Sequence, residues 1–271
     1  MSAAVVMTVY NRPLIVLCNT FAALKRAVPD ERVIVVDDAS TTLPTLSQVC
    51  ADFGFEYVRC DTIAECPGTY NIDGYNNPAH AFNVGIESAK GADELIIMSS
   101  DIIVQSKFAE LLKLYREQKL LEQCVWMPTV VDMDSGNPFL SPICHWPMPW
   151  FCVTLLKHVE AIGRYDEKYL KGIAFEDNDF SGRLLSHVGN LIIDGNFIAY
   201  HQSHPQIAYS DKGYGWTINE TYTREKWGGV PFRPQDMSMR LELAERGDNV
   251  AAFRVSRGTR QAEAMQFGVV P

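Results

Sequence analysis

The sequence predicts an α/β protein built on a Rossmann-like, doubly wound and mostly parallel sheet. Short runs of β-branched and other apolar residues alternate with longer helical stretches through the first hundred residues. The runs at residues 4–9 and 33–36 are nearly continuous in apolar residues, which is typical of strands buried on both faces of a parallel sheet. A helical stretch lies between most consecutive runs, as right-handed crossovers between parallel strands require.

Four strands and four helices are expected before residue 123. The strands are predicted at residues 4–9, 33–36, 55–58 and 95–98. The helices are predicted at residues 14–28, 43–53, 78–90 and 107–119. Pro13 suits the start of the first helix and Gly91 the end of the third, because proline favours helix starts and glycine favours helix ends.

The pattern changes after residue 123. We expect a strand at 124–131, helices at 155–162 and 176–187, strands at 191–193 and 197–200, and a last helix at 237–245. Residues 65–77 and 202–216 exceed ordinary connection lengths, which predicts lids or disorder. These changes divide the chain into residues 1–123, residues 124–205 and a C-terminal extension, 206–271.

Composition places the chain among ordinary globular proteins. Of its 271 residues, 47% are hydrophobic and 11% aromatic, which excludes a disordered chain. The 33 acidic against 24 basic side chains give a net charge of −9, which disfavours a surface that binds nucleic acid throughout. A local basic patch, or an acidic site that works through a metal, stays open.

The location expected from the sequence is cytoplasmic. No segment approaches the ~20 apolar residues of a membrane span. The apolar run at residues 3–7 is too short for a signal peptide and has no basic segment before it. The seven cysteines form no pair at zinc-knuckle or redox spacing, which favours reduced, buried thiols.

Polar side chains follow three of the predicted strands. Residues 8–12, Thr-Val-Tyr-Asn-Arg, end the first strand, Asp37 and Asp38 end the second, and Asp101 follows the fourth. Ligands of an open parallel sheet bind beyond the carboxyl ends of its strands. Asp37 and Asp38 alone are equally well explained as a turn with a helix cap, and an isolated Asp101 is more often a cap than a ligand. Their joint placement favours a site for a divalent cation or for the hydrogen-bond donors of a nucleoside.

Motifs for other chemistries are missing. No G-x-G-x-x-G follows the first strand and no Walker-type G-x-x-x-x-G-K occurs, so a bound nucleotide would need side chains and a metal. G-x-S-x-G and H-E-x-x-H are also absent, which argues against a serine hydrolase or a zinc protease.

A second acidic cluster opens the helix predicted at 176–187. Glu176, Asp177 and Asp179 would all be stabilised there by the helix dipole, by about 0.3–1 kcal/mol each. Asp179 and Arg183 form an i,i+4 pair, which favours a structural role for Asp179. Glu176 and Asp177 have no such partner in the sequence.

These pieces together resemble the family-2 glycosyltransferases of the GT-A fold. The resemblance covers about residues 3–205, and its motifs occur in the family's order: VVMTVYNRP at 5–13, VIVVDDAS at 33–40, NVG at 83–85, SSD at 99–101, GRYDE at 163–167 and ED at 176–177. No single motif is specific. The resemblance rests on the number, order and spacing of these motifs.

The resemblance implies a role for each matching residue. Asp101 would bind a divalent metal that bridges the donor diphosphate, and His201 would be a further metal ligand, with His204 a weaker candidate. Asp177 would be the general base, supported by Glu176. The donor-binding residues would be Thr8, Tyr10, Asn11, Arg12, Asp38, Asn83 and Ser100.

The implied activity is inverting transfer of a sugar from a nucleoside-diphosphate sugar, with UDP favoured, to an acceptor hydroxyl. Residues 1–123 would bind the nucleotide sugar, and residues 124–205 would supply the catalytic and acceptor half. The metal would be Mn²⁺ or Mg²⁺, with Mn²⁺ favoured by an imidazole ligand. Trp146 and Trp150 could stack against the acceptor, although core packing explains them equally well.

Two departures from the family keep alternatives open. Ser99 stands at the first acidic position of the D-x-D motif, so transfer without a metal remains an alternative. Phe82 stands where arginine often precedes the asparagine, so His80 or Arg12 would have to contact the diphosphate. A non-catalytic nucleotide-sugar-binding protein and a sugar-phosphate nucleotidyltransferase are the rival interpretations, although the second lacks its Gly-rich basic loop.

The sequence leaves the partners open. The acceptor could be a glycan, a lipid carrier, a protein or modified DNA. Arg254, Arg257 and Arg260 against Glu263 make the last 22 residues basic, which favours a solvated tail or an oligomer contact over an anionic acceptor.

Overall fold

A computed structural model describes residues 1–71, 76–141, 148–204, 213–228 and 250–254. Its strands are β1 Ala3–Val9, β2 Arg32–Asp38, β3 Glu56–Cys60, β4 Glu94–Met98, β5 Ile102–Ile103, β6 Val125–Asp132, β7 Pro138–Leu140, β8 Phe151–Leu155, β9 Asn190–His201 and β10 Val250–Arg254. Its helices are α1 Leu14–Ala27, α2 Leu46–Phe53, α3 Thr62–Glu65, α4 Ala79–Ser88, α5 Phe108–Glu117, α6 Leu156–Ala161, α7 Glu176–Val188 and α8 Gly213–Trp227. The 3₁₀ turns are η1 Leu120–Glu122 and η2 Glu167–Lys171.

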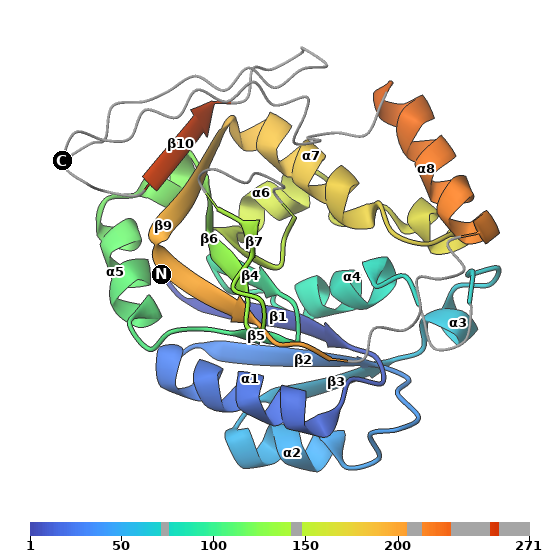
Figure 1. Cartoon of the computed structure of the whole chain (residues 1–271), viewed down its shortest axis with the longest axis horizontal. Helices are drawn as coiled ribbons and strands as arrows, with labels where there is room; N and C mark the ends of the chain where they lie inside the picture. The colour runs from blue at the N-terminus through green and yellow to red at the C-terminus, as the bar shows by residue number, and fades with distance from the viewer. Residues whose placement is uncertain (72–75, 142–147, 205–212, 229–249, 255–271) are drawn as a thin grey trace.

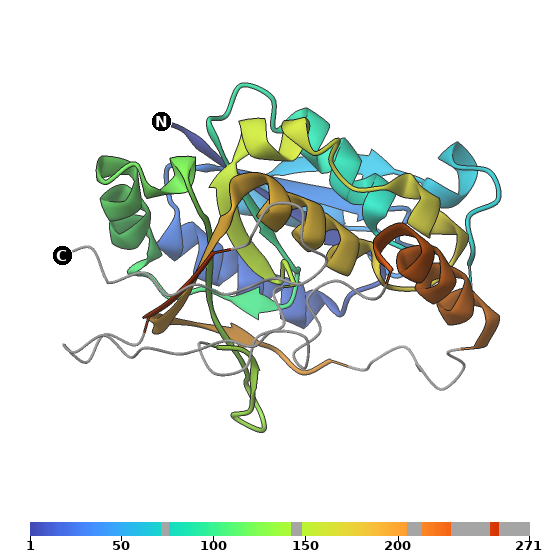
Figure 2. The ribbon, with the colours of Figure 1, turned by 90° about the horizontal axis from the view of Figure 1, so that it is seen from above.

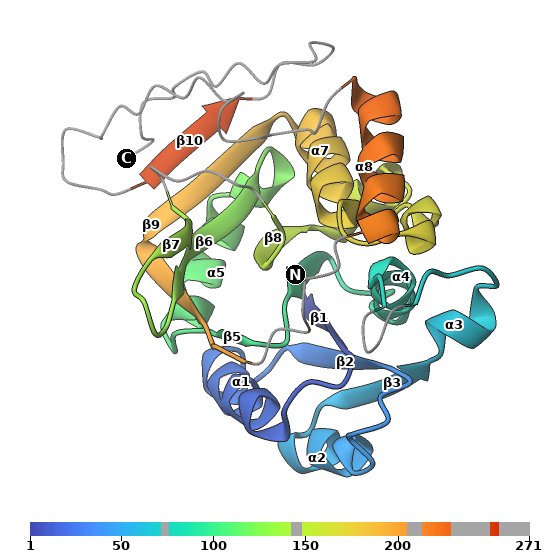
Figure 3. The ribbon, with the colours of Figure 1, turned by 45° about the vertical axis from the view of Figure 1, so that its right-hand side comes forward.

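The predicted α/β sheet is confirmed. Its strands run in the order β10-β9-β6-β8-β4-β1-β2-β3, and β3, β2, β1 and β4 are parallel to one another. Beyond β4 the sheet is mixed, because β8 runs antiparallel to both β4 and β6 while β6 and β9 are parallel. Helices α1 and α2 cover one face of the parallel part and α4 covers the other (Figures 1 and 3).

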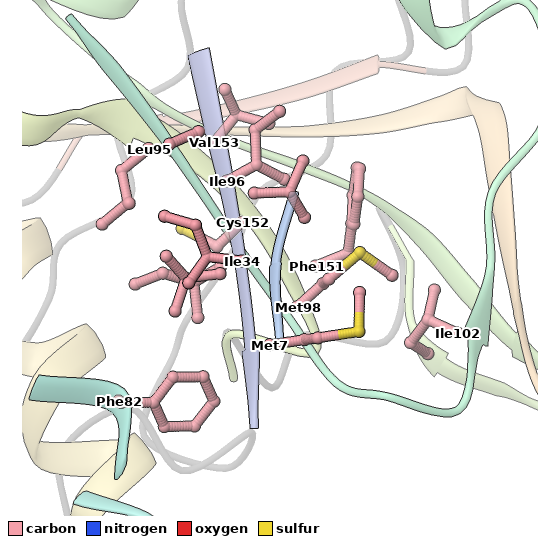
Figure 4. Packing of buried hydrophobic residues seen from close by; sticks show 14 of the residues in the cluster. Met7, Ile34, Phe82, Leu95, Ile96, Met98, Ile102, Phe151, Cys152 and Val153 are labelled. Carbon is pink, nitrogen blue, oxygen red and sulfur yellow. The ribbon is translucent and has the colours of Figure 1, made fainter. Parts of the chain in front are cut away.

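The core lies between these layers. Residues of β1 and β4 are fully buried on both faces, as their continuous apolar runs predict. Met98 and Phe151 are cross-strand partners and lie together in Figure 4. Helix α4 approaches β1 closely because Gly85 has no side chain there; an added Cβ would collide with Val6 and lie 2.9 Å from Val36 Cγ2.

Several elements differ from the sequence predictions. Strands β5, β7, β8 and β10 were not predicted. Each is short or lies beside proline and aromatic residues that favour a loop locally. The two strands predicted at 191–193 and 197–200 are one strand, β9, with a register shift opposite β6. Asp194 accepts a backbone hydrogen bond from Asn196 at 2.8 Å within this shift, which explains the polar interruption in the sequence.

The described residues of the first long connection pack against the rest of the chain. The backbone N–H of Tyr70 donates to the carbonyl of Leu170 at 2.7 Å, and Asn76 and Asn77 are buried. Helix α8 was not predicted, and it begins at Gly213, inside the stretch expected as a lid or disordered loop at 202–216. The helix predicted at 237–245 lies outside the described residues.

The described parts of the C-terminal extension pack on the rest of the chain. Strand β10 pairs antiparallel with β9 at the edge of the sheet. Helix α8 lies beside η2 and the start of α7 (Figures 2 and 3). Within the described residues, no helix is both long enough and apolar enough to cross a bilayer.

Candidate active site

The carboxyl ends of β1, β2 and β4 meet at one edge of the sheet and carry the polar residues that the sequence singled out. Thr8 lies in β1 and pairs with Val36 of β2, and Tyr10, Asn11 and Arg12 follow it. Ser100 is buried after β4, and its carbonyl accepts a hydrogen bond from Thr20 Oγ1 at 3.1 Å.

Asp37 and Asp38 have different environments. Asp37 accepts from the backbone N–H of Ser40 at 2.9 Å, from the Tyr57 hydroxyl at 2.7 Å and from Arg59 at 2.9 Å. Asp37 therefore serves the turn after β2, one of the two interpretations left open by the sequence. Asp38 is only 2% exposed and accepts from the Thr62 backbone N–H at 2.8 Å through Oδ1.

The loop after β1 is held against the loop after β2 by Asn11. Its backbone is in the left-handed region, at φ 47°. Its side-chain oxygen accepts from the backbone N–H groups of Thr41 at 2.9 Å and Thr42 at 3.1 Å. Next to it, burial raises the pKa of Tyr10, and the charges of Asp38 and Asp61 add to this, so its phenol stays protonated.

Asp101 lies in a cluster with two histidines and Arg12. Its Oδ2 is 3.0 Å from Nε2 of His204, 3.7 Å from Nε2 of His201 and 3.2 Å from Nη2 of Arg12. Burial raises the pKa of Asp101, but the His204 hydrogen bond and the nearby cationic groups outweigh it, and the pKa is lowered. Arg12 also contacts Nε2 of His204 through Nη1.

Strand pairing brings these residues together across about a hundred positions of the chain. Ile102 of β5 pairs with His201 at the end of β9, and the Gln202 backbone N–H donates to the carbonyl of Asp101 at 2.9 Å. The predicted pair of Asp101 and His201 is therefore adjacent. His204, the weaker candidate in the sequence, lies nearer to Asp101 than His201 does.

The Asp101 cluster fits a divalent metal. Ligand atoms of Asp101, His201 and His204 all lie within 4.8 Å of one another. Among the described residues, Oδ1 of Asp101 and Nδ1 of His201 are buried without a hydrogen-bond partner, although Asp132 Oδ2 lies 3.8 Å from that nitrogen. One carboxylate and two imidazoles suit Mn²⁺ better than Mg²⁺. Arg12 shares the Asp101 carboxylate, so a bound metal would compete with it.

Glu176 and Asp177 begin α7, and the two residues before them have strained backbone conformations. Ala174 and Phe175 both have positive φ, 59° and 70°, at a cost of about 1–3 kcal/mol each for non-glycine residues. Asn219 of α8 donates to the carbonyl of Ala174 at 2.8 Å. The Phe175 ring packs edge-on against Trp216 of α8, with centroids 4.7 Å apart.

Both carboxyl groups have raised pKa values. Burial, followed by the charge of Asp177, raises the pKa of Glu176 to about 8, and burial raises that of Asp177 to about 6. Glu176 accepts a 2.7 Å hydrogen bond from Asn77, and Asp177 accepts a 3.4 Å bond from the Tyr165 hydroxyl. At neutral pH the pair therefore holds one negative charge, mainly on Asp177.

An aromatic stack positions Tyr165. Its ring lies between Phe82, with centroids 4.8 Å apart, and Phe180, 4.2 Å away, and all three rings are nearly parallel. Phe82, which departs from the family pattern, thus packs against Tyr165, whose hydroxyl contacts Asp177 of the acidic pair. Asn83 donates to the Tyr165 carbonyl at 3.0 Å and accepts from its N–H at 2.9 Å, so its contact with a donor stays a prediction.

The remaining sequence predictions have varied outcomes. The Asp179–Arg183 pair is present at 2.7 Å. Trp150 is half-buried against Phe139, with centroids 5.4 Å apart, whereas Trp146 lies outside the described residues. Asn76, Asn77 and Asn219 were not predicted as site residues. The two consecutive asparagines at 76–77 were the one sequence feature that indicated a polar site there.

Likeness to solved structures confirms the GT-A fold expected from the sequence, in which a mixed α/β sheet carries polar residues at the carboxyl ends of its parallel strands. Solved structures share it. TarS residues 1–349 from S. aureus in complex with UDP-GlcNAc has a TM-score of 0.66 at 12% identity, covering 89% of this chain and 68% of that chain. A second structure of S. aureus TarS has a TM-score of 0.59 at 12% identity, and the match covers 90% of this chain and 46% of that chain.

GalNAc-T7 with UDP, GalNAc and Mn²⁺ is a third structure with this fold. Its TM-score is 0.58 at 14% identity, and the match covers 82% of this chain and 48% of that chain. Neither models of known protein families nor curated protein sequences match the chain.

Proposed function

We propose that the chain is an inverting glycosyltransferase that moves a sugar from a UDP-sugar to an acceptor hydroxyl. The observation that carries the proposal is the acidic pair at the start of α7. A buried pair that holds one charge at neutral pH supplies a carboxylate base with a pKa near the working pH, as general-base catalysis requires. The GT-A neighbours that contain UDP, UDP-GlcNAc or Mn²⁺ support the same substrate class.

The donor would lie at the carboxyl ends of β1, β2 and β4. Asp38 and Tyr10 would contact the nucleoside, and Arg12 the diphosphate. Asp101, His201 and His204 would hold Mn²⁺ or Mg²⁺, which neutralises charge on a leaving diphosphate. Ser99 leaves this metal one carboxylate instead of two, so a metal-independent enzyme is the alternative within the proposal.

Asp177 would take the proton of the acceptor hydroxyl. Glu176 stays protonated beside it, held by Asn77, and its neutrality lets Asp177 carry the charge. The Tyr165 hydroxyl donates to Asp177 and fixes its orientation. A single displacement with this base on the far side of the sugar inverts the anomeric carbon. The positioned base contributes about 10²–10⁴-fold, or about 3–5 kcal/mol of barrier.

Thermal-shift screening of UDP-sugars with Mn²⁺ or a chelator tests donor and metal together. We expect a UDP-sugar to raise Tm and Mn²⁺ to increase the shift. Slow Mn²⁺-dependent hydrolysis of the same donor would support an enzyme over a non-catalytic binding protein. No shift with any nucleotide sugar would contradict the proposal. The acceptor class, an oligomer formed through residues 206–271 and a cytoplasmic location remain predictions from the sequence.

A further inference from the structure

A second group of side chains that could bind a metal lies outside the Asp101 cluster and the acidic pair. Cys66 follows α3, His80 lies in the first turn of α4 and Glu167 begins η2. Ligand atoms of these three residues all lie within 4.8 Å of one another. From this geometry we propose a zinc site formed by Cys66, His80 and Glu167.

The hydrogen bonds of His80 provide the orientation that a ligating imidazole needs. Its Nδ1 is 3.1 Å from Oε1 of Glu167, and its Nε2 is 3.0 Å from Oε2 of Glu65. Metal-bound histidines usually donate their other ring N–H to a carboxylate, which fixes the ring and its tautomer. Nδ1 therefore faces the metal position beside Glu167, while the Nε2–H donates to Glu65.

The charges at this place favour a cation. Glu65, Glu167 and the Cys66 thiol surround one imidazole. A divalent cation would hold the Cys66 sulfur as thiolate, because coordination deprotonates a thiol.

The ligand types select zinc over the metals proposed for the Asp101 cluster. A thiolate, an imidazole and a carboxylate suit Zn²⁺, whereas Mg²⁺ and Mn²⁺ prefer oxygen ligands. Bonds of about 2.0–2.3 Å place ligand atoms about 3.3–3.8 Å apart around tetrahedral zinc, so shifts of about 1 Å would close the site. Water would complete the fourth position.

A metal here would fix the wall of the donor site. Cys66 follows α3 directly, and the first residue of α3, Thr62, donates its backbone N–H to Asp38 at 2.8 Å. Zinc would join α3 to α4 and η2, three segments that are distant in the sequence. This role of the metal, in holding segments together, is separate from the acidic pair that would perform catalysis.

Cobalt substitution of the full-length protein tests the site. Co²⁺ bound by a thiolate gives a charge-transfer absorption in the near ultraviolet, and the Asp101 cluster contains no cysteine to produce it. The experiment uses the Asp101→Asn variant, so that Co²⁺ at the other cluster does not interfere. We expect the band in this background, its loss in Cys66→Ser and its retention in Cys18→Ser, a half-buried thiol on α1.

Three further measurements keep the test decisive if Cys66→Ser misfolds. His80→Gln keeps the thiol and should also lose the band. Glu65→Gln should weaken zinc binding about 10–100-fold, as loss of an outer carboxylate does. Zinc should also protect Cys66 from alkylation in the unaltered chain. Absence of the band from the Asp101→Asn protein would overturn the zinc site. Retention of the full band in both Cys66→Ser and His80→Gln would also overturn it. Neither result would affect the glycosyltransferase proposal.

Discussion

Asn77 donates a 2.7 Å hydrogen bond to Glu176, a residue 99 positions further along the chain. The preceding residue, Asn76, lies 3.4 Å from Oδ2 of Asp38 through its side-chain nitrogen. Two consecutive asparagines thus link the predicted nucleoside-binding aspartate to the acidic pair of α7. These two hydrogen bonds connect the end of β2 to the start of α7, and no motif in the sequence indicates this connection.

Replacing the proposed base should stop transfer without removing the donor. In Asp177→Asn the side chain keeps its shape but cannot accept a proton at neutral pH, so we expect transfer to fall about 10²–10⁴-fold. Donor binding, measured by calorimetry with a UDP-sugar, should remain nearly unchanged. Asp134→Asn, at an exposed turn between β6 and β7, is the control. Transfer at the unaltered rate in Asp177→Asn would remove Asp177 from the mechanism.

The rate of transfer should depend on pH through Asp177. Burial raises its pKa from 3.8 to about 6, so the active carboxylate is lost as pH falls through that value. We expect kcat/KM to rise with pH and to level off above it. The Tyr165 hydroxyl lowers this pKa, so Tyr165→Phe should move the midpoint upward while the aromatic stack remains. A profile without a transition in this range would contradict the assignment.

Glu176 should make the fold less stable at higher pH. Burial and the charge of Asp177 raise its pKa from 4.5 to about 8, so between these values the folded state holds a proton that the unfolded state has released. The free energy of unfolding therefore falls as pH rises through this window. In Glu176→Gln this fall should be smaller, as thermal denaturation at several pH values would show. Equal slopes for both proteins would refute the raised pKa.

His204 should contribute to metal binding as much as His201. It lies 3.0 Å from Oδ2 of Asp101, nearer than His201 at 3.7 Å. We expect His204→Ala to weaken Mn²⁺ binding about 10-fold or more, measured by calorimetry without nucleotide. The exposed His187 provides the control substitution, His187→Ala. Unchanged Mn²⁺ affinity in His204→Ala would leave Asp101 and His201 as the protein ligands.

Gly172 should be required for the approach of α8 to the acidic pair. A Cβ at this position would collide with the carbonyl oxygen of Gly215 and lie 2.6 Å from Oδ1 of Asn219. We expect Gly172→Ala to lower the free energy of unfolding by about 1–3 kcal/mol, as overpacking does. Gly213→Ala, at the first residue of α8, meets nothing within 4 Å and serves as the control. Equal stability of the two variants would show that α8 shifts without loss.

The parallel half of the fold could be predicted because its signals are local. The apolar runs of β1, β2 and β4 are buried on both faces, and such runs specify their strands without reference to the rest of the chain. Strand β8 was missed because Phe151–Leu155 follows a proline- and tryptophan-rich stretch and finds its place only between β4 and β6. Helix α8 was missed for a similar reason: its glycines favour a loop locally, but packing against Tyr70 requires Gly215, where an added Cβ would collide with the Tyr70 ring.

The sequence by itself determined the α/β class, the acidic residues at the strand ends and the charged first turn of α7. Tertiary structure alone decided which of these residues meet. Asp101 reaches His204 across 103 positions because β5 pairs with β9, and Cys66 reaches His80 and Glu167 because α3, α4 and η2 converge. Local patterns fix the conformation of a segment, whereas sites form between segments whose approach depends on the packing of the whole sheet.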